Sequence, residues 1–263
     1  HQSWPARTSQ DEDQSSGIWD REARQWAQKP DADSENDPLI VLMRQKGALA
    51  PEHSFLDVGC GPGRYSVVLA REAKFVVGCD SSAEMIRAAR QRALTEGRRN
   101  VRFEVSSWKS FCPREVFDVV FAHRTGAIDS VEDIEHMTRL SRRWCFYTVF
   151  LRRENKAVAA VRKAAGFAGG PRYDQHVCRV LSHLIEKGFF PHISYRSEVR
   201  SKLMPIEQAT QWCLNRLRLR AQLSLQQQEQ AASAVSLLAR DGMVDMTQQA
   251  LLVDIDWRAD KEL

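Results

Sequence analysis

The sequence contains no long apolar run and no strong excess of one charge. Among its 263 residues, with a net charge of +4, no apolar stretch approaches the ~20 residues of a membrane-spanning helix. A charged-then-apolar start, as in a signal peptide, is also missing, so we expect a cytoplasmic protein with no membrane partner. The small net charge by itself gives no indication of nucleic-acid binding.

The cysteines and histidines do not cluster. The six cysteines are Cys60, Cys79, Cys112, Cys145, Cys178 and Cys213. Because they form no C-x-x-C pair and no Cys/His spacing typical of zinc, we expect reduced thiols and no metal site. With 43% hydrophobic and 27% charged residues, the composition is typical of an ordinary globular protein.

Short apolar runs alternate with segments of helical periodicity. The expected strands are 54–58, 75–79, 101–105, 117–122, 145–150, 193–203 and 250–255. The expected helices include 18–28, 38–46, 64–72, 131–140, 205–219 and 225–239. Since the connections between the first strands are long enough for crossover helices, the pattern predicts an α/β fold with a mostly parallel sheet covered on both faces.

This pattern also predicts how the chain is organised. Residues 1–17 are polar and lack periodicity, which is typical of a flexible leader. Residues 18–263 are expected to form one domain. Its expected parts are an N-terminal helical cap, 18–48, a core, 49–150, and a C-terminal half, 151–263, with a helical insertion at about 205–240.

The most informative stretch is Leu56-Asp57-Val58-Gly59-Cys60-Gly61-Pro62-Gly63. A carboxylate near the end of an apolar strand is followed by three glycines at alternate positions and then by a helix. Glycine loses more conformational entropy on folding than other residues, so closely spaced glycines are expected where the backbone has to approach a ligand closely. A buried carboxylate is costly unless it is paired. The next strand ends in Asp80, seventeen residues beyond Gly63. Together these features predict a polar ligand beside the loop.

With Val76-Val77-Gly78-Cys79-Asp80-Ser81-Ser82-Ala83-Glu84-Met85 included, the chain resembles the class I S-adenosylmethionine-dependent methyltransferases. The resemblance implies a Rossmann-like three-layer sandwich whose mostly parallel seven-stranded sheet has an antiparallel C-terminal strand. It also implies S-adenosylmethionine as cofactor, S-adenosylhomocysteine as product, and methyl transfer by in-line displacement.

The resemblance implies a set of cofactor-binding residues. These are Asp57, Gly59, Cys60, Gly61, Gly63, Asp80, Ser81, Met85, Ser107 and Trp108. The loop amides would receive the cofactor's carboxylate, Asp57 would orient its ammonium, and Asp80 would accept hydrogen bonds from both ribose hydroxyls. Ser81 is expected to cap the helix that contains Met85, with Glu84 three residues later as in a capping box.

The adenine contacts follow the family pattern less closely. Met85 is expected either against adenine or in the helix core. After the third strand the family commonly has an acidic residue, whereas this chain reads Ser106-Ser107-Trp108. Ser107, the backbone near Trp108, or the stacked Trp108 ring is therefore expected to contact adenine.

His123 follows a strand at the carboxyl edge of the sheet, where ligands bind in open α/β folds. Its ordinary pKa near ~6.5 makes it the candidate base, which is needed only when the methyl acceptor holds a proton at neutral pH. The alternative is an incidental imidazole. Arg124 is a candidate for binding an anionic acceptor, and Trp19 and Trp212 are candidates for enclosing it; surface exposure and core packing are their alternatives.

Three classes of function remain open. A small-molecule acceptor is favoured because helical elements at both ends of the sequence suit a modest pocket. An RNA or protein acceptor is the alternative, although the Asn/Asp-Pro-Pro-Tyr motif is absent where the chain reads Ala122-His123-Arg124-Thr125. The third class comprises proteins that transfer no methyl group. One is an NAD-dependent oxidoreductase, against which Arg64 argues because the dinucleotide fingerprint requires glycine there. The other is a non-catalytic cofactor-binding protein, which nothing in the sequence excludes. The sequence leaves the oligomeric state and the methylated atom open.

Overall fold

The computed structural model describes residues 2–3, 11–169, 173–219 and 221–261, with side chains from residue 16 onward in the first helix. Contacts divide the chain into two compact units. Unit 1 comprises His1–Ile18, Phe150–Asp174 and Tyr195–Leu252. Unit 2 comprises Trp19–Val149, Gln175–Ser194 and Val253–Leu263.

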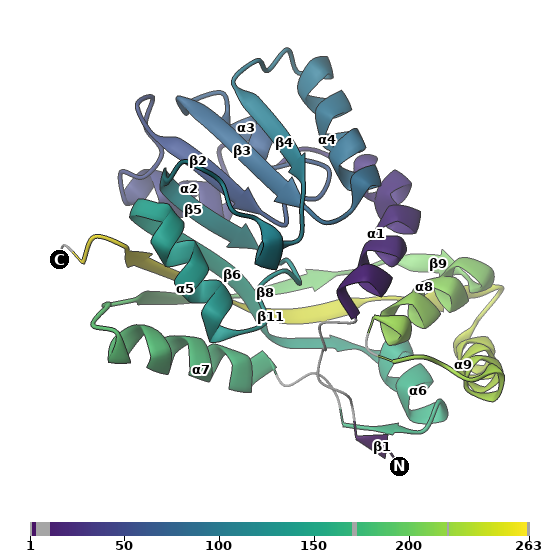
Figure 1. The fold of residues 1–263 in the computed structure, drawn as a ribbon. Helices are drawn as coiled ribbons and strands as arrows, with labels where there is room; N and C mark the ends of the chain where they lie inside the picture. Colours follow the sequence, from purple (N-terminus) through teal and green to yellow (C-terminus); the bar gives the residue numbers. More distant parts are fainter. Residues whose placement is uncertain (1, 4–10, 170–172, 220, 262–263) are drawn as a thin grey trace. The chain divides into compact units, whose positions relative to one another are not determined.

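A seven-stranded sheet has the strand order β4-β3-β2-β5-β6-β11-β8 (Figure 1). Its strands are β2 (Ser54–Val58), β3 (Phe75–Asp80), β4 (Val101–Val105), β5 (Phe117–His123), β6 (Ser141–Asn155), β8 (His192–Arg200) and β11 (Gln248–Arg258). Strands β2 to β6 pair in parallel. The expected strands 54–58 and 101–105 have the observed bounds, whereas the one expected at 145–150 is much longer.

Strand β11 runs antiparallel to β6. Near the start of β6, Arg143 accepts a hydrogen bond through its carbonyl from Ala259 N, just after the end of β11. Near the end of β6, Arg153 donates to Gln248 at the start of β11. The predicted fold class, a mostly parallel seven-stranded Rossmann-like sheet with an antiparallel C-terminal strand, is therefore confirmed.

Among the helices that accompany this sheet, the two predicted at 38–46 and 131–140 begin at the predicted residues, and two others require correction. The accompanying helices are α1 (Asp11–Ala27), α2 (Pro38–Gln45), α3 (Ser66–Leu69), α4 (Ala83–Thr95), α5 (Val131–Leu140) and α7 (Tyr173–Glu186). Helix α1 begins at Asp11, inside the expected leader, rather than at the predicted residue 18. Helix α3 is shorter than the predicted 64–72, since the chain turns after Leu69.

The apolar face of unit 2 explains why these elements pack. Phe55 of β2, Val119 and Phe121 of β5 and Phe146 of β6 belong to one buried cluster with residues of α2, α3 and α4. Alternation along the strands turns Leu56 and Val120, which are also fully buried, to the opposite face. The sheet is thus apolar on both faces, as a parallel sheet covered by helices requires.

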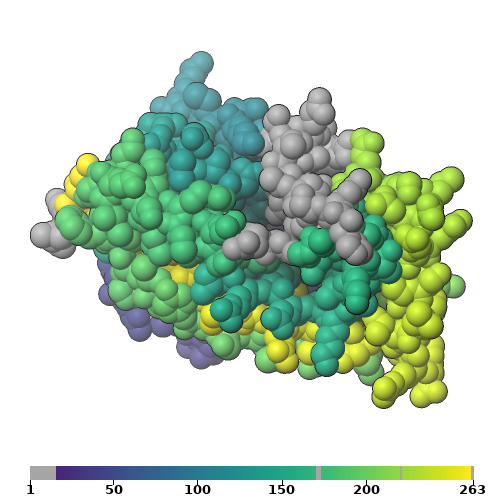
Figure 2. Space-filling view, turned by 90° about the horizontal axis from the view of Figure 1, so that it is seen from below, coloured from purple at the N-terminus to yellow at the C-terminus, as the bar shows by residue number. Residues whose placement is uncertain are grey.

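Unit 1 contains its own apolar core. Helices α6 (Lys156–Ala164), α8 (Ile206–Arg218) and α9 (Leu225–Leu238) share buried residues that include Val161, Leu217 and Val235. Two short sheets pair β1 (Gln2–Ser3) with β7 (Phe167–Ala168) in parallel and β9 (Leu203–Pro205) with β10 (Met243–Asp245) in antiparallel. Gln226 and Gln230 of α9 are exposed. The segment that contains α8 and α9 has the yellow-green colours at the right of Figure 2.

The β9–β10 pair corrects the prediction of one continuous strand over 193–203. Strand β8 ends at Arg200, and the chain then enters β9. The predicted helices 205–219 and 225–239 correspond closely to α8 and α9. The division into a flexible leader and a single domain stays a prediction.

Among the helices of the described ranges, none combines the length and apolar character that a membrane crossing requires. The cytoplasmic location stays a prediction.

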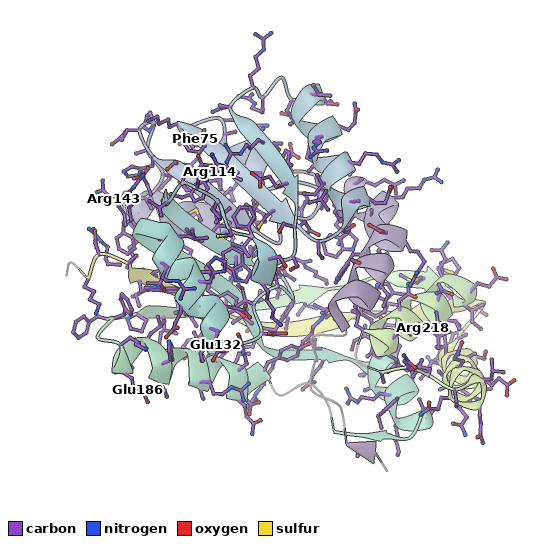
Figure 3. The ribbon with its side chains drawn as sticks, viewed as in Figure 1. Phe75, Arg114, Glu132, Arg143, Glu186 and Arg218 are labelled. Carbon is purple, nitrogen blue, oxygen red and sulfur yellow. The ribbon has the colours of Figure 1, made fainter. Side chains whose placement is uncertain are left out.

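The parallel strands define two edges of the sheet in unit 2. Asp80 and His123 end β3 and β5 at the carboxyl edge. Phe75 and Arg143, labelled in Figure 3, lie near the starts of β3 and β6 at the amino edge. The loop that follows β2 belongs to the carboxyl edge, where open α/β sheets bind ligands.

Candidate functional site

The loop after β2 has a backbone that only glycine adopts easily. Gly59, Gly61 and Gly63 have φ angles of 65°, 54° and 74°. A Cβ atom on Gly59 would lie 2.0 Å from Thr125 Oγ1, and one on Gly63 would lie 2.9 Å from the Phe103 ring. A Cβ on Gly61 would point into open space among the described residues. The first and third glycines therefore allow close packing within the protein, whereas the second presents bare backbone to a potential ligand.

Asp80 connects this loop to the helix that follows β3. Its Oδ2 accepts a hydrogen bond from Gly61 N at 2.9 Å, and its Oδ1 accepts one from Ser82 N at 2.9 Å. Burial raises the pKa of Asp80, and the charge of Asp20 raises it further. A carboxylate offers about four lone-pair positions, so an oriented Asp80 can accept further hydrogen bonds from a diol.

Asp57 lies deeper, at 4% exposure, within β2. Ser66 Oγ donates to its Oδ2 at 2.6 Å. Burial raises the pKa of Asp57 to about 7 against the opposing effect of the Ser66 bond, and Asp80 adds to the increase. A bound cation near this carboxyl group would favour its ionised form, so Asp57 suits an ammonium ligand.

Ser82, rather than the predicted Ser81, is the N-cap of α4. Its Oγ accepts a hydrogen bond from Met85 N at 3.1 Å, because Ser82 has the extended backbone of a cap. Ser82 Oγ donates in turn to Asp20 Oδ1 of α1 at 2.5 Å. Asp20 Oδ1 also accepts a hydrogen bond from Glu84 N at 3.2 Å. Sequence analysis missed Asp20, since a single acidic residue in an amphipathic helix gives no signal for a contact so distant in the chain.

The residues expected near adenine have partners within the protein. Met85 is buried in α4 at 3% exposure. Ser107 Oγ accepts from Ser110 N at 3.3 Å and caps the short helix η1 (Trp108–Ser110). The Trp108 ring stacks on His136, with 4.3 Å between ring centroids, and is 4% exposed. This packing favours the backbone of Trp108 over its ring for a contact with adenine; the adenine contacts of all three residues stay predictions.

His123 contacts Tyr65 and, through it, is linked to Asp37; sequence analysis missed both residues. Tyr65 donates its hydroxyl hydrogen to Asp37 Oδ2 at 2.7 Å, and the same Tyr65 oxygen lies 3.4 Å from His123 Nε2. The rings of Tyr65 and His123 meet edge to face with centroids 4.4 Å apart. Two features of the sequence could have pointed to these residues. Tyr65 follows the glycine loop closely, and Asp37 directly precedes Pro38 at the start of a helix.

Arg124 has a backbone that is uncommon for a residue with a side chain. Its φ is 55°, and its N donates to Thr148 O at 2.8 Å. Left-handed non-glycine residues are enriched at functional sites. Burial raises the pKa of Tyr65, Asp37 raises it further, and the charge of Arg124 opposes both. The role of Arg124 in binding an anionic acceptor stays a prediction.

The two tryptophans predicted near the acceptor belong to different units. Trp19 of unit 2 packs edge to face on Trp26, with centroids 6.2 Å apart. Trp212 of unit 1 lies under the guanidinium of Arg216 at 4.8 Å. Their substrate contacts stay predictions.

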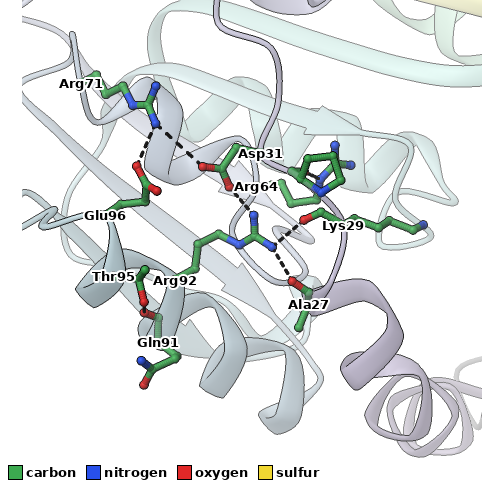
Figure 4. A network of polar contacts seen from close by, with 10 residues as sticks. Ala27, Lys29, Asp31, Arg64, Arg71, Gln91, Arg92, Thr95 and Glu96 are labelled. Atoms are coloured by element: carbon green, nitrogen blue, oxygen red, sulfur yellow. Dashed lines mark hydrogen bonds and ion pairs between the residues drawn. The ribbon is translucent and has the colours of Figure 1, made fainter.

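The segment after α1 is attached to α4 and the glycine loop (Figure 4). Arg92 of α4 donates to the carbonyls of Ala27 at 2.8 Å and Lys29 at 2.9 Å, and it pairs with Asp31. Arg64 donates to the carbonyl of Pro30. Arg64 thus has a structural partner at the position where a dinucleotide fingerprint requires glycine.

Two further observations limit the chemistry. The Cys60 thiol is buried, which raises its pKa, so this residue contributes backbone rather than a reactive sulfur to the loop. Within the described ranges, no three or more His, Cys, Asp or Glu side chains form a group that could hold a metal ion.

The chain is similar to known proteins over part of its length. Residues 49–164 match a family model described as a methyltransferase domain. Trans-aconitate 2-methyltransferase of Rhodococcus jostii is 33% identical over 115 residues, 43% of this chain and 40% of that protein. The 23S rRNA (uracil(1939)-C(5))-methyltransferase RlmD of Pseudoalteromonas translucida is 34% identical over 110 residues, 38% of this chain and 24% of that protein. The chain thus spans less than half the length of both relatives.

Solved structures share the fold. A crystal structure of a methyltransferase of unproven activity from Bacillus halodurans superposes with a TM-score of 0.53 at 17% identity, covering 83% of this chain and 97% of that chain. Magnesium protoporphyrin IX methyltransferase from Synechocystis, crystallised with S-adenosylhomocysteine, has a TM-score of 0.50 at 16% identity, covering 83% and 80%. At these identities the likeness shows the fold alone.

Proposed function

We propose that this chain, whose residues 49–164 match a methyltransferase-domain model, binds S-adenosylmethionine and transfers its methyl group to an acceptor, as the class I methyltransferases do. The observation that carries the proposal is the hydrogen bond of 2.9 Å between Gly61 N and Asp80 Oδ2. This hydrogen bond joins the carboxylate that would bind the ribose to the backbone amide of a loop residue that has no side chain. An isolated glycine loop or an isolated strand-end aspartate would support the proposal much less.

The residues of the loop fit the cofactor. The open space beside Gly61 allows close approach of a ligand to the backbone, and the loop amides suit its carboxylate. Asp57 receives the ammonium, and Asp80 accepts hydrogen bonds from the ribose hydroxyls. When bound, S-adenosylmethionine supplies a methyl group activated by its sulfonium. The protein contributes mainly by orienting the acceptor behind that methyl group and by excluding water.

The acceptor is a small molecule. His123 and Arg124 at the carboxyl edge of the sheet offer an imidazole and a cation, which suit a polar or anionic acceptor. The match to a trans-aconitate 2-methyltransferase supports a small acceptor. An RNA acceptor is the second candidate, because a 23S rRNA methyltransferase is among the relatives.

Calorimetric titration tests the cofactor. We expect S-adenosylmethionine and S-adenosylhomocysteine to bind with micromolar dissociation constants and NAD to give no measurable heat. Binding of NAD without binding of S-adenosylmethionine would overturn the proposal and favour an oxidoreductase. Binding of S-adenosylmethionine without transfer to any fraction in the next experiment would leave a cofactor-binding protein.

Transfer of a labelled methyl group tests the acceptor. The protein and labelled S-adenosylmethionine are incubated with a metabolite extract, an RNA fraction and a protein fraction, and separately with trans-aconitate. We expect label in the metabolite extract. Label confined to RNA or to protein would contradict the small-molecule proposal while keeping the methyltransferase activity.

A further inference from the structure

Three side chains from separate elements form a hydrogen-bonded chain at the carboxyl edge of the sheet. Asp37 is the N-cap of α2, Tyr65 directly precedes α3, and His123 ends β5. The distances are 2.7 Å from Tyr65 Oη to Asp37 Oδ2 and 3.4 Å from Tyr65 Oη to His123 Nε2. The order of donors along this chain determines which nitrogen of His123 carries a proton.

The Asp37 end of the chain accepts hydrogen bonds. Asp37 Oδ1 accepts from Leu39 N at 3.0 Å and from Ile40 N at 3.5 Å, both in the first turn of α2. The positive end of a helix dipole and these amide donors favour a negatively charged carboxylate. Asp37 Oδ2 therefore accepts the hydroxyl hydrogen of Tyr65.

Tyr65 then has no second hydrogen to donate. A phenol has one O–H donor, and its oxygen retains lone pairs that accept. Burial and the charge of Asp37 both raise the pKa of Tyr65, so the phenol keeps its hydrogen at neutral pH. A hydrogen bond between the Tyr65 oxygen and His123 Nε2 consequently requires the hydrogen on Nε2.

We propose that Asp37 and Tyr65 are positioning residues that hold His123 as its Nε2–H tautomer, so that Nδ1 is the nitrogen that accepts the methyl acceptor's proton. The edge-to-face contact of the two rings, at an interplanar angle of 74°, keeps the imidazole in place for this hydrogen bond. The assignment of Nδ1 to catalysis rests on the proposed methyl transfer; the tautomer itself does not.

The proton transfer balances when the reacting atom of the acceptor is a protonated oxygen or nitrogen. That atom forms a bond to the methyl carbon, and the electron pair of the broken carbon–sulfur bond stays on sulfur. The hydrogen of the reacting atom passes to His123 Nδ1, which is cationic until it releases a proton to water. Asp37, through Tyr65, stabilises this cation because each hydrogen bond of the chain points toward the carboxylate.

Nitrogen-15 NMR of histidine-labelled protein without ligand tests the tautomer. Long-range couplings from the ring carbon-bound protons distinguish protonated from unprotonated nitrogens, and His123→Gln assigns the signal. In the wild-type protein above pH 8 we expect His123 Nε2 to be protonated and Nδ1 unprotonated. In Tyr65→Phe, which keeps the ring but removes the acceptor oxygen, we expect the Nε2–H to Nδ1–H ratio to fall by about fivefold, the effect of one ordinary hydrogen bond.

Tyr147→Phe is the matched control, because Tyr147 is a buried tyrosine whose oxygen lies 2.9 Å from a different histidine, His176 Nε2. It should leave the His123 signals unchanged. A predominantly Nδ1–H His123 in the wild-type protein would overturn the proposal without any variant, and so would an unchanged ratio in a folded Tyr65→Phe protein.

A titration with S-adenosylhomocysteine separates this inference from the proposed function. Tyr65→Phe should bind the ligand within about threefold of the wild-type affinity, because the hydroxyl does not belong to the cofactor loop. Failure of the wild-type protein to bind it would refute the proposed function while leaving the tautomer assignment intact. A wild-type protein that binds the ligand but has Nδ1–H would refute the tautomer assignment alone.

Discussion

Aspartates at the two edges of the sheet in unit 2 have pKa values shifted in opposite directions. At the carboxyl edge, burial raises the pKa of Asp57 and of Asp80, whose hydrogen bonds come from hydroxyl and amide groups. At the amino edge, burial alone would raise the pKa of Asp118, but bonds from Ser54 and the nearby His53 and Arg142 lower it.

Asp256, also at the amino edge, lies between two basic side chains. Its side chain is 1% exposed, and it lies 3.0 Å from Lys46 Nζ and 2.9 Å from His192 Nδ1. Buried charges that have cationic partners within the protein need no ligand, whereas carboxylates held by neutral donors are ready for an external cation or hydroxyl. The contrast teaches that the type of partner, rather than the presence of a buried aspartate, distinguishes the candidate site from structural ion pairs.

The largest expected effect is the loss of cofactor affinity in Asp80→Ala. Removing the carboxylate that we propose accepts two ribose hydrogen bonds should weaken S-adenosylhomocysteine binding by about 100-fold, or ~3 kcal/mol. Calorimetry measures the change. Asp118→Ala, at the opposite edge, is the matched control and should bind within about threefold of wild type. Wild-type affinity in a folded Asp80→Ala protein would contradict the ribose contact.

Lys46→Met should reduce stability rather than binding. The variant removes the ammonium group beside the buried Asp256 and leaves the carboxylate next to His192, so we expect a loss of about 2 kcal/mol in the free energy of unfolding. Urea denaturation measures it, with Lys74→Met as the control at an exposed lysine. A stability equal to that of the control variant would show that Asp256 does not depend on Lys46.

Cofactor affinity should depend on pH through Asp57. Its pKa of about 7 in the free protein means that the carboxyl group is protonated below that pH, whereas the cofactor's ammonium favours the ionised form. Binding should therefore weaken as the pH falls, by ~10- to 30-fold between pH 7.5 and 5.5. Calorimetry across this range measures the dependence. Asp57→Asn should flatten the profile, and a wild-type profile that is already flat would disagree with this role.

The smallest effect is expected for Arg142→Ala. The pair with Asp118 spans 3.9 Å, and the Arg142 side chain is 55% exposed, so solvent screens it. We expect a change of no more than about 0.5 kcal/mol in the free energy of unfolding, measured in urea, and no change in cofactor affinity. A loss as large as that of Lys46→Met would mean that the two amino-edge pairs are equivalent.

The fold was accessible from the sequence because its signals are local. The alternation of short apolar runs with amphipathic segments predicted β2 and β4 with their observed bounds. Boundaries that depend on a cap were harder, as Ser82 in place of Ser81 shows. The pairing of β9 with β10 joins segments far apart in the chain, which no local pattern encodes.

The proximity of the glycine loop to the two strand-end carboxylates was predictable from the sequence, whereas the partners of His123 were not. Asp57, Asp80 and the glycine loop lie close together because parallel neighbouring strands end at one edge. Tyr65 and Asp37 were missed, since an isolated tyrosine and a helix-capping aspartate have ordinary local explanations. Only the approach of β5 to the start of α3 brings them to His123.

The sequence by itself determined the alternating α/β pattern, the left-handed glycine loop and the carboxylate that follows at Asp80, because each depends on neighbouring residues or on fixed spacing. Tertiary structure alone decided which carboxylates meet cations and which meet neutral donors. It also decided that Asp37, Tyr65 and His123 share one hydrogen-bonded chain. Partners and burial set the charge of a side chain, and both arise only when distant segments pack together.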